Sequence, residues 1–285
     1  MTDAVPAPAA VAPGPVAREL RRHAVVVAVV AVWMALGWAL RADGNTYLLM
    51  GIPLLWLFQR LVAQRPLAEL WFAQPGRFAL PWWGWLVAAT FMILPIHDLA
   101  TWENPGWAVR LWLVAAAIGA IPLAWSLARA TGPQWREIGL GVAFAGSAGL
   151  LTLLLTFFLR SHPDRSALDR LLEGLRSFVL YVPVCFMIEE VFFRGGLDSY
   201  LTRGGLRSPW LSAFFLSALW GWWHLPIVPL AADHRAAQLL TLVVTLPLVH
   251  GGVGALLSYF WRRSGILLAP VAAHAFIDAV RNALQ

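Results

Sequence analysis

The chain has 285 residues, of which 60% are hydrophobic and 13% are charged, about half the charged fraction of an ordinary soluble domain. A water-soluble fold cannot bury that much apolar surface, so the composition predicts an integral membrane protein. The formal net charge of +6 comes from arginine alone, because the sequence contains no lysine, and charges in a membrane protein lie at the ends of its spans. This distribution argues against a nucleic-acid partner, and the single cysteine, Cys185, excludes an internal disulfide.

The chain opens with an Ala- and Pro-rich segment, residues 1–20, which we expect to be a disordered tail. Arginines at the end of this segment precede the apolar run 24–40, which has no clear small-residue cleavage site and is predicted to be a retained helix rather than a signal peptide. Arginine-only, Ala-rich usage is typical of a GC-rich genome and indicates a bacterial inner membrane. The loop arginines favour a cytoplasmic amino terminus.

Further apolar runs follow along the whole chain. A hydrocarbon core of about 30 Å takes about 20 apolar residues of helix. On that measure the candidate spans are 24–40, 47–63, 81–100, 107–128, 138–159, 177–202, 209–230, 238–260 and 265–283. We therefore expect an all-α, polytopic transmembrane helix bundle of about eight or nine spans.

Two adjacent glutamates interrupt one of these runs. Glu189 and Glu190 lie within FVLYVPVCFMIEEVFFRGG, where a charged carboxylate is costly unless it is paired or faces a wet cavity. Arg194 follows Glu190 by four residues, so a helix would place both on one face as an ion pair. A pair that only fixes packing would explain Glu190 but leaves Glu189 available for chemistry.

The next polar groups in apolar surroundings are histidines. His224 lies in PWLSAFFLSALWGWWHLPIVPL, and His274 with Asp278 lies in ILLAPVAAHAFIDAV, four residues apart on one helix face. Each group could be a hydrogen-bonded packing feature. The expected depths agree, however, because Glu189 and His224 each lie about 20 Å along their helices from the loop near residue 203. We therefore expect one shared site in the last four helices.

The three segments resemble a known family in residues and in order. EEVFFRG at 189–195, WGWWH ending at His224 and HAFID at 274–278 are similar to the three motifs of the CPBP family, which contains the type II CAAX prenyl endopeptidases and the Abi and bacteriocin-processing proteins. The resemblance covers about residues 175–283. One departure is Trp220, where the family usually has Phe, so that the shape of the pocket is expected to differ.

The resemblance implies an intramembrane endopeptidase that acts on a membrane-associated protein or peptide. Glu189 and His224 would activate a water, His274 and Asp278 would hold the developing oxyanion or orient its donor, and Glu190 and Arg194 would support them. No cofactor is favoured, although zinc held by Glu189, His224 and His274 remains an alternative. The corresponding domains are the tail 1–20, accessory transmembrane helices at 21–174 and a catalytic core at 175–285.

Other readings remain open. A serine peptidase could use Ser147 with His250, but neither residue has an evident orienting partner in the sequence. A catalytically silent membrane protein of the same fold could bind or regulate a partner, because membership of a family does not guarantee turnover. Buried acids and histidines also serve proton-coupled transporters, but no inverted repeat is visible.

Overall fold

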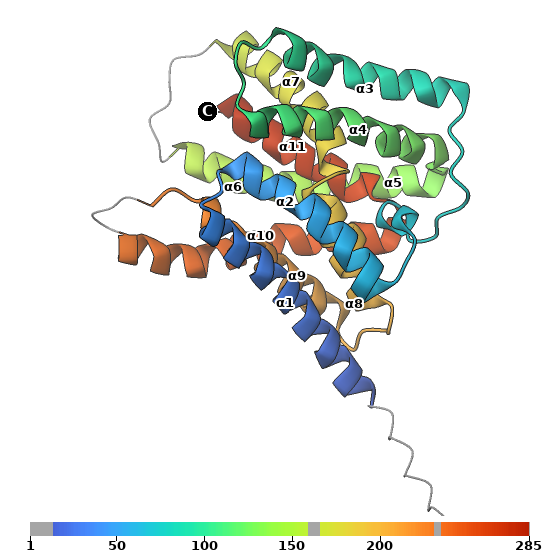
Figure 1. The fold of residues 1–285 in the computed structure, drawn as a ribbon, viewed down its shortest axis with the longest axis vertical. Helices are drawn as coiled ribbons and strands as arrows, with labels where there is room; N and C mark the ends of the chain where they lie inside the picture. Colours follow the sequence, from blue (N-terminus) through green and yellow to red (C-terminus); the bar gives the residue numbers. More distant parts are fainter. Residues whose placement is uncertain (1–13, 159–165, 231–234, 285) are drawn as a thin grey trace, which may run out of the picture.

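The computed structural model describes residues 14–158, 166–230 and 235–284, and they form an all-helical bundle (Figure 1). The first half contains α1 (Pro15–Leu40), α2 (Gly44–Leu57), the π-helical η1 (Phe58–Ala63), the 3-10 turn η2 (Leu67–Leu70), α3 (Trp82–Thr101), α4 (Trp107–Arg129), α5 (Gly132–Gly141), the π-helical η3 (Val142–Gly146) and α6 (Ser147–Phe158). The second half contains α7 (Ala167–Cys185), the π-helical η4 (Val191–Asp198), α8 (Ser199–Thr202), α9 (Pro209–Trp223), the 3-10 turn η5 (Leu225–Ile227), α10 (Arg235–Ser264) and α11 (Leu268–Leu284). This confirms the all-α class.

Helix α1 begins earlier than the sequence suggested. Gly14 precedes the helix and Pro15 occupies its first turn, where the fixed φ of proline suits helix initiation. The helix therefore includes residues 15–20, which were assigned to the tail. Residues 1–13 of that expected tail lie outside the described residues.

Five of the described helical segments are long and apolar enough to cross a membrane. They are Pro15–Leu40, Gly44–Ala63, Trp82–Thr101, Trp107–Arg129 and Arg235–Ser264. The other expected spans correspond to shorter or interrupted helices, including α9 with 15 residues and α11 with 17. The expected total of eight or nine is thus not reached on length and hydropathy alone.

Helix α11 lies inside the bundle and packs against α7, α5 and α10, whereas α3 and α1 lie at opposite edges (Figure 1). Small residues allow the closest approach between α9 and α10. A Cβ added at Gly221 of α9 would lie 2.4 Å from the carbonyl oxygen of Leu246 in α10, so only glycine fits there. This contact sets α9 and α10 side by side.

Two of the expected spans are broken in the structure. The run 177–202 is interrupted at residues 186–188, and the run 209–230 leaves the α-helix after Trp223, ahead of Pro226. Backbone carbonyls freed by these breaks accept hydrogen bonds from distant side chains. The indole of Trp71 donates to Phe186 O at 2.9 Å, and the hydroxyl of Tyr47 donates to Trp223 O at 2.8 Å.

Candidate active site

A cavity of about 330 Å³ lies where the broken helices meet α10 and α11. Four of the predicted site residues, Glu189, His224, His274 and Asp278, contribute to its wall. The remaining lining residues are Leu48, Gly149, Leu153, Tyr181, Trp220, Trp223, Ile227, Val249, His250, Val253, Ile277 and Arg281. The structure thus brings these four side chains into one space, although their roles remain predictions.

Glu189 and His224 lie at helix ends rather than in the middle of continuous spans, which corrects the expectation from the sequence. Glu189 opens the helical segment that follows the break at 186–188, and His224 is the carboxy-terminal cap of α9. Each residue nevertheless lies at the end of its helical segment that is remote from the loop joining α8 to α9. Both side chains line the same cavity.

Glu189 is oriented by the residue that departs from the family pattern. The indole nitrogen of Trp220 donates a hydrogen bond to Oε2 of Glu189 at 3.1 Å. A phenylalanine at this position has no such donor. Trp220 therefore does more than widen the pocket, because it fixes one oxygen of the candidate base.

Glu190 and Arg194 lie behind the cavity wall, and both side chains are fully buried. Nε of Arg194 lies 3.5 Å from Oε2 of Glu190, as the four-residue spacing predicted, even though η4 is π-helical. The guanidinium also lies over the ring of Trp220, 5.1 Å from its centroid. Oε1 of Glu190 accepts a hydrogen bond from Nδ1 of His274 at 2.9 Å. Glu190 therefore links the helix of the first motif to that of the third.

His274 is held between two carboxylates. Its Nδ1 bonds Glu190, and its Nε2 lies 3.5 Å from Oδ2 of Asp278. Asp278 is held in turn by Nη1 of Arg281 at 2.9 Å, and the same guanidinium lies 3.3 Å from the hydroxyl of Tyr181. Both ring nitrogens of His274 therefore face acceptors, an arrangement that suits a ring that donates hydrogen bonds.

His224 and His250 differ from His274 in their partners. Nδ1 of His224 lies 2.8 Å from Trp220 O, and Nδ1 of His250 lies 2.8 Å from Leu246 O. A carbonyl only accepts hydrogen bonds, so each Nδ1 is the donor and each Nε2 keeps a lone pair. The ring centroids are 4.4 Å apart. The cavity thus contains two neighbouring imidazoles that can accept a proton.

One comparison with known proteins decides the family of the carboxy-terminal part. Residues 172–280 match the family model described as type II CAAX prenyl endopeptidase Rce1-like. We call residues 172–280 the Rce1-like domain, after the family model to which they are similar. The resemblance predicted from the three motifs is thereby confirmed. No curated protein and no solved structure matches the chain.

The match has consequences at the level of the family. An Rce1-like domain together with several long apolar helices supports an integral membrane protein, and it supports a CAAX-type intramembrane protease in general terms. The bilayer and a peptide substrate follow as partners in the same general sense. The Rce1-like domain includes α9, α10 and most of α7 and α11, so every motif residue belongs to it.

The described residues of the Rce1-like domain offer no suitable set of ligands for a metal ion. Among the described residues, no three His, Cys, Asp or Glu side chains are grouped closely enough to hold one ion. His274, one of the three predicted zinc ligands, contacts the Glu190 carboxylate through Nδ1 and has the Asp278 carboxylate 3.5 Å from Nε2. We therefore derive no chemical step through a metal.

Sequence reasoning did not assign His250, Tyr181 and Arg281 to this site. His250 stood out only as the base of a serine peptidase, yet Ser147 is exposed and lies outside the cavity lining. A signal was present, since His250 interrupts the apolar run TLPLVHGGVGALL, as His224 interrupts its own. Arg281 follows Asp278 by three residues, a spacing that also predicts an ion pair on one helix face.

Proposed function

We propose that the protein is an intramembrane endopeptidase that hydrolyses a peptide bond in a membrane-associated protein or peptide. The observation that carries the proposal is that one cavity is lined by a carboxylate, Glu189, and by two imidazoles with free lone pairs, His224 and His250. A water between these groups has acceptors for its protons. The family match supports hydrolysis of a peptide bond as the reaction.

In the proposed reaction, Glu189 takes a proton from a water oriented by Nε2 of His224, and the water oxygen bonds to the carbonyl carbon of the substrate. His274 and Asp278 stabilise the negative charge that develops on the carbonyl oxygen, His274 by donation from Nε2, which makes no hydrogen bond within the described part of the chain, and Asp278 by orienting the ring. The C–N bond then breaks, and the protonated Glu189 returns its proton to the leaving amine. Glu190 and Arg194 contact no substrate and position His274.

His250 is part of this proposal as a second acceptor beside His224. Its ring also lies edge-on to Trp220, with centroids 4.9 Å apart, and Trp220 bonds Glu189. A neutral imidazole at this position accepts a hydrogen bond from the attacking water or from the leaving amine. The three-motif pattern contains no residue at this place, so His250 is an addition to the predicted site.

The surroundings of the site are also part of the proposal. We place the catalytic core at 175–285 and the accessory helices at 21–174, in the bacterial inner membrane, with about eight or nine crossings in all. The shorter helices α9 and α11 would then complete the spans that length and hydropathy alone leave out.

Proteolysis of a membrane-anchored peptide library by the purified protein tests the function. We expect the unmodified protein to cut a subset of peptides, and the Glu189→Gln and His224→Ala variants to bind the same peptides without cutting them. His97→Ala is the matched control, because His97 is exposed on α3 and lies outside the cavity lining. If the unmodified protein binds peptides but never cuts them, the protein is a silent binding partner and the enzymatic reading is wrong.

A further inference from the structure

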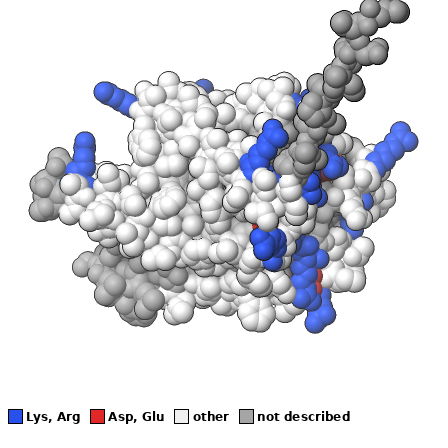
Figure 2. Space-filling model, turned by 90° about the horizontal axis from the view of Figure 1, so that it is seen from below, with Lys and Arg blue, Asp and Glu red and all other residues white. Residues whose placement is uncertain are grey.

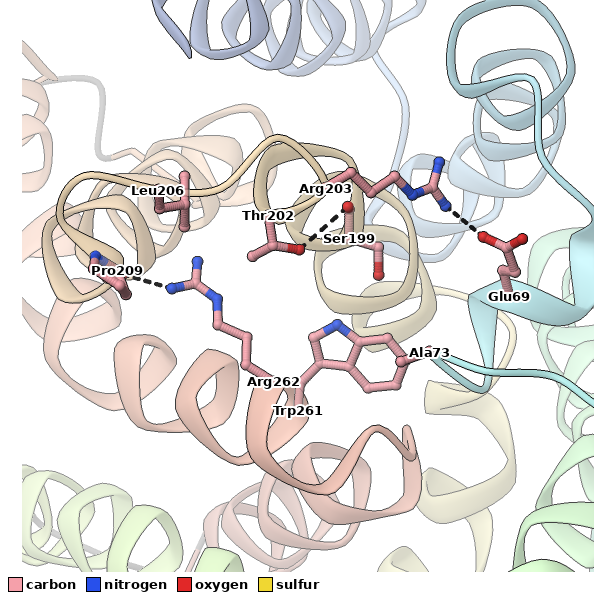
Figure 3. A pocket seen from close by; sticks show the side chains of 9 residues that line it. All are labelled: Glu69, Ala73, Ser199, Thr202, Arg203, Leu206, Pro209, Trp261 and Arg262. Atoms are coloured by element: carbon pink, nitrogen blue, oxygen red, sulfur yellow. Dashed lines mark hydrogen bonds and ion pairs between the residues drawn. The ribbon is translucent and has the colours of Figure 1, made fainter. Parts of the chain in front are cut away.

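A second hollow, of about 370 Å³, lies beside α8 (Figure 3). It is lined by Glu69, Ala73, Ser199, Thr202, Arg203, Leu206, Pro209, Trp261 and Arg262. Arginine side chains gather on one side of the protein when it is viewed from the end where α1 begins (Figure 2). This hollow is separate from the candidate active site, and the proposed reaction uses none of its residues.

Positive charge is in excess beside the hollow. Nη2 of Arg203 lies 2.8 Å from Oε2 of Glu69, and Nη1 of Arg65 lies 3.4 Å from the other oxygen of the same carboxylate. Arg22 packs over Gly204, where an added Cβ would be 1.8 Å from Nη1 of Arg22. These three guanidinium groups, which we call the Arg22/Arg65/Arg203 cluster, thus lie near one another, and only those of Arg65 and Arg203 pair with the Glu69 carboxylate. Burial and the neighbouring Arg65 and Arg22 lower the pKa of Arg203, while Glu69 opposes the shift.

Arg262 on the far side of the hollow has its charge already satisfied. Its guanidinium pairs with both carboxylate oxygens of Asp198 and also donates to the carbonyl oxygen of Pro209. Arg262 therefore lines the hollow without offering an unpaired charge to a ligand. The unmatched charge lies on the side of Arg203, next to α1.

The hollow also contains a hydrogen-bond donor without a partner. Trp261 is only 2% exposed, and its indole nitrogen has no hydrogen-bond acceptor among the residues that the structure describes. Figure 3 shows this nitrogen directed into the hollow. The hydroxyls of Ser199 and Thr202 are occupied, because they donate to the carbonyls of Arg194 and Asp198. This nitrogen is not fully shielded from the hollow, so water or an anion there can accept its hydrogen bond.

An apolar groove leads away from the same cluster. It lies between α1 and α2, has a volume of about 350 Å³, and is lined by Val25, Ala28, Val29, Val32, Leu54, Leu57, Phe58, Leu61 and Val62. Arg22 precedes the first of these residues by three positions, and Arg65 follows the last by three. The antiparallel helices therefore place the arginines at the end of the groove where α1 begins and η1 ends (Figure 1). Apolar and cationic surface are continuous here.

We propose that this surface is a binding site for an anionic phospholipid. The phosphate lies against the Arg22/Arg65/Arg203 cluster and one acyl chain lies in the groove between α1 and α2. Guanidinium groups suit phosphate oxygens because their donors form a planar fork. Basic pockets between transmembrane helices at the cytoplasmic end recognise anionic headgroups in the same way. A soluble anion would leave the groove unused.

Lipid binding to the purified full-length protein in phosphatidylcholine nanodiscs tests the proposal, with phosphatidylglycerol as the probe. We expect phosphatidylglycerol to bind more tightly than phosphatidylcholine. Arg22→Gln should weaken binding about fivefold, and Arg22→Gln with Arg65→Gln about 25-fold, since each arginine near an anionic lipid contributes a factor of that size. Arg22 has no ion pair among the described residues, so its replacement leaves the fold intact. Arg60→Gln is the matched control, because Arg60 is exposed on η1 and outside both hollows.

Three outcomes would overturn the proposal. If phosphatidylcholine binds as tightly as phosphatidylglycerol, the headgroup charge has no role. If Arg60→Gln weakens phosphatidylglycerol binding as much as Arg22→Gln does, the arginines act only by general electrostatic attraction. Displacement of the lipid by inorganic phosphate at a similar concentration makes the ligand a free anion. A tail-directed variant, Val29→Trp, fills the groove and should weaken lipid binding while leaving inorganic phosphate binding unchanged. If it leaves lipid binding unaltered, the acyl chain is not in the groove.

Discussion

Nδ1 of His274 and Oε1 of Glu190 are 2.9 Å apart, although the two residues are 84 positions apart in the chain. This bond separates the roles of the two adjacent glutamates. Glu189 lines the cavity, whereas Glu190 is fully buried behind it and holds a histidine of the wall. The two adjacent glutamates look equivalent in the sequence, but they have different positions and different contacts in the structure.

We expect Glu190→Gln to retain a small part of the activity and Glu189→Gln to lose it. Glutamine at 190 keeps the shape but leaves Arg194 without its carboxylate, and breaking a buried ion pair costs about 3 to 5 kcal/mol of stability. The unfolding temperature in detergent should therefore fall clearly for Glu190→Gln and only slightly for Glu189→Gln. Equal unfolding temperatures for the two variants would contradict the division of roles.

His250→Ala tests the second acceptor in the cavity. We expect kcat to fall by about a hundredfold, within the usual range for loss of a general acid or base, while peptide binding persists. The pH dependence of kcat should lose one ionisation in the variant. If His250→Ala changes peptide affinity and leaves the pH profile as it was, His250 only shapes the pocket.

Trp220→Phe restores the residue usual in the family and removes the hydrogen bond to Glu189. We expect kcat to fall about tenfold with little change in KM, because hydrogen bonds to charged groups contribute about 1.5 to 3 kcal/mol and this one orients the candidate base. The matched control is Trp222→Phe, since Trp222 is exposed and its indole bonds only the carbonyl of Val243. Unchanged kcat in Trp220→Phe would show that the indole serves packing alone.

The close approach of α9 and α10 is tested by Gly221→Ala. The added methyl meets the backbone of Leu246, and overpacking of this kind costs about 1 to 3 kcal/mol. Because Leu246 O also holds His250, both stability and activity should fall together. Gly252→Ala on α10 is the control, since a Cβ there meets open space. A Gly221→Ala protein as stable as the Gly252→Ala protein would refute this account of the packing.

Metal removal separates the proposed mechanism from the zinc alternative. We expect proteolysis to be indifferent to strong chelators and the purified protein to contain no stoichiometric zinc by elemental analysis. Loss of activity on chelation, with recovery on adding zinc, would contradict the metal-free mechanism and would require His274 to leave its carboxylate partners.

The sequence predicted the helical class and the three motif segments that match the family model. It could do so because apolar runs, the four-residue spacing of Glu190 and Arg194, and the cost of polar groups in hydrocarbon are local features. It missed the helix breaks at Glu189 and His224, because both flanks remain apolar and hydropathy does not register a lost backbone hydrogen bond. The contact between His224 and His250 depends on how closely α9 and α10 pack. That distance is fixed by tertiary structure and not by spacing along the chain.

The hydrogen bonds that close the two helix breaks come from outside the Rce1-like domain. Trp71 and Tyr47 belong to the preceding half of the chain, yet their side chains satisfy the carbonyls of Phe186 and Trp223 within the domain. A fragment that starts at residue 172 would forfeit both bonds, and each buried carbonyl left without a donor costs about 1 to 3 kcal/mol. The boundary drawn by homology thus cuts through the hydrogen bonding of the fold, because the amino-terminal half supplies the donors that complete the motif-bearing half.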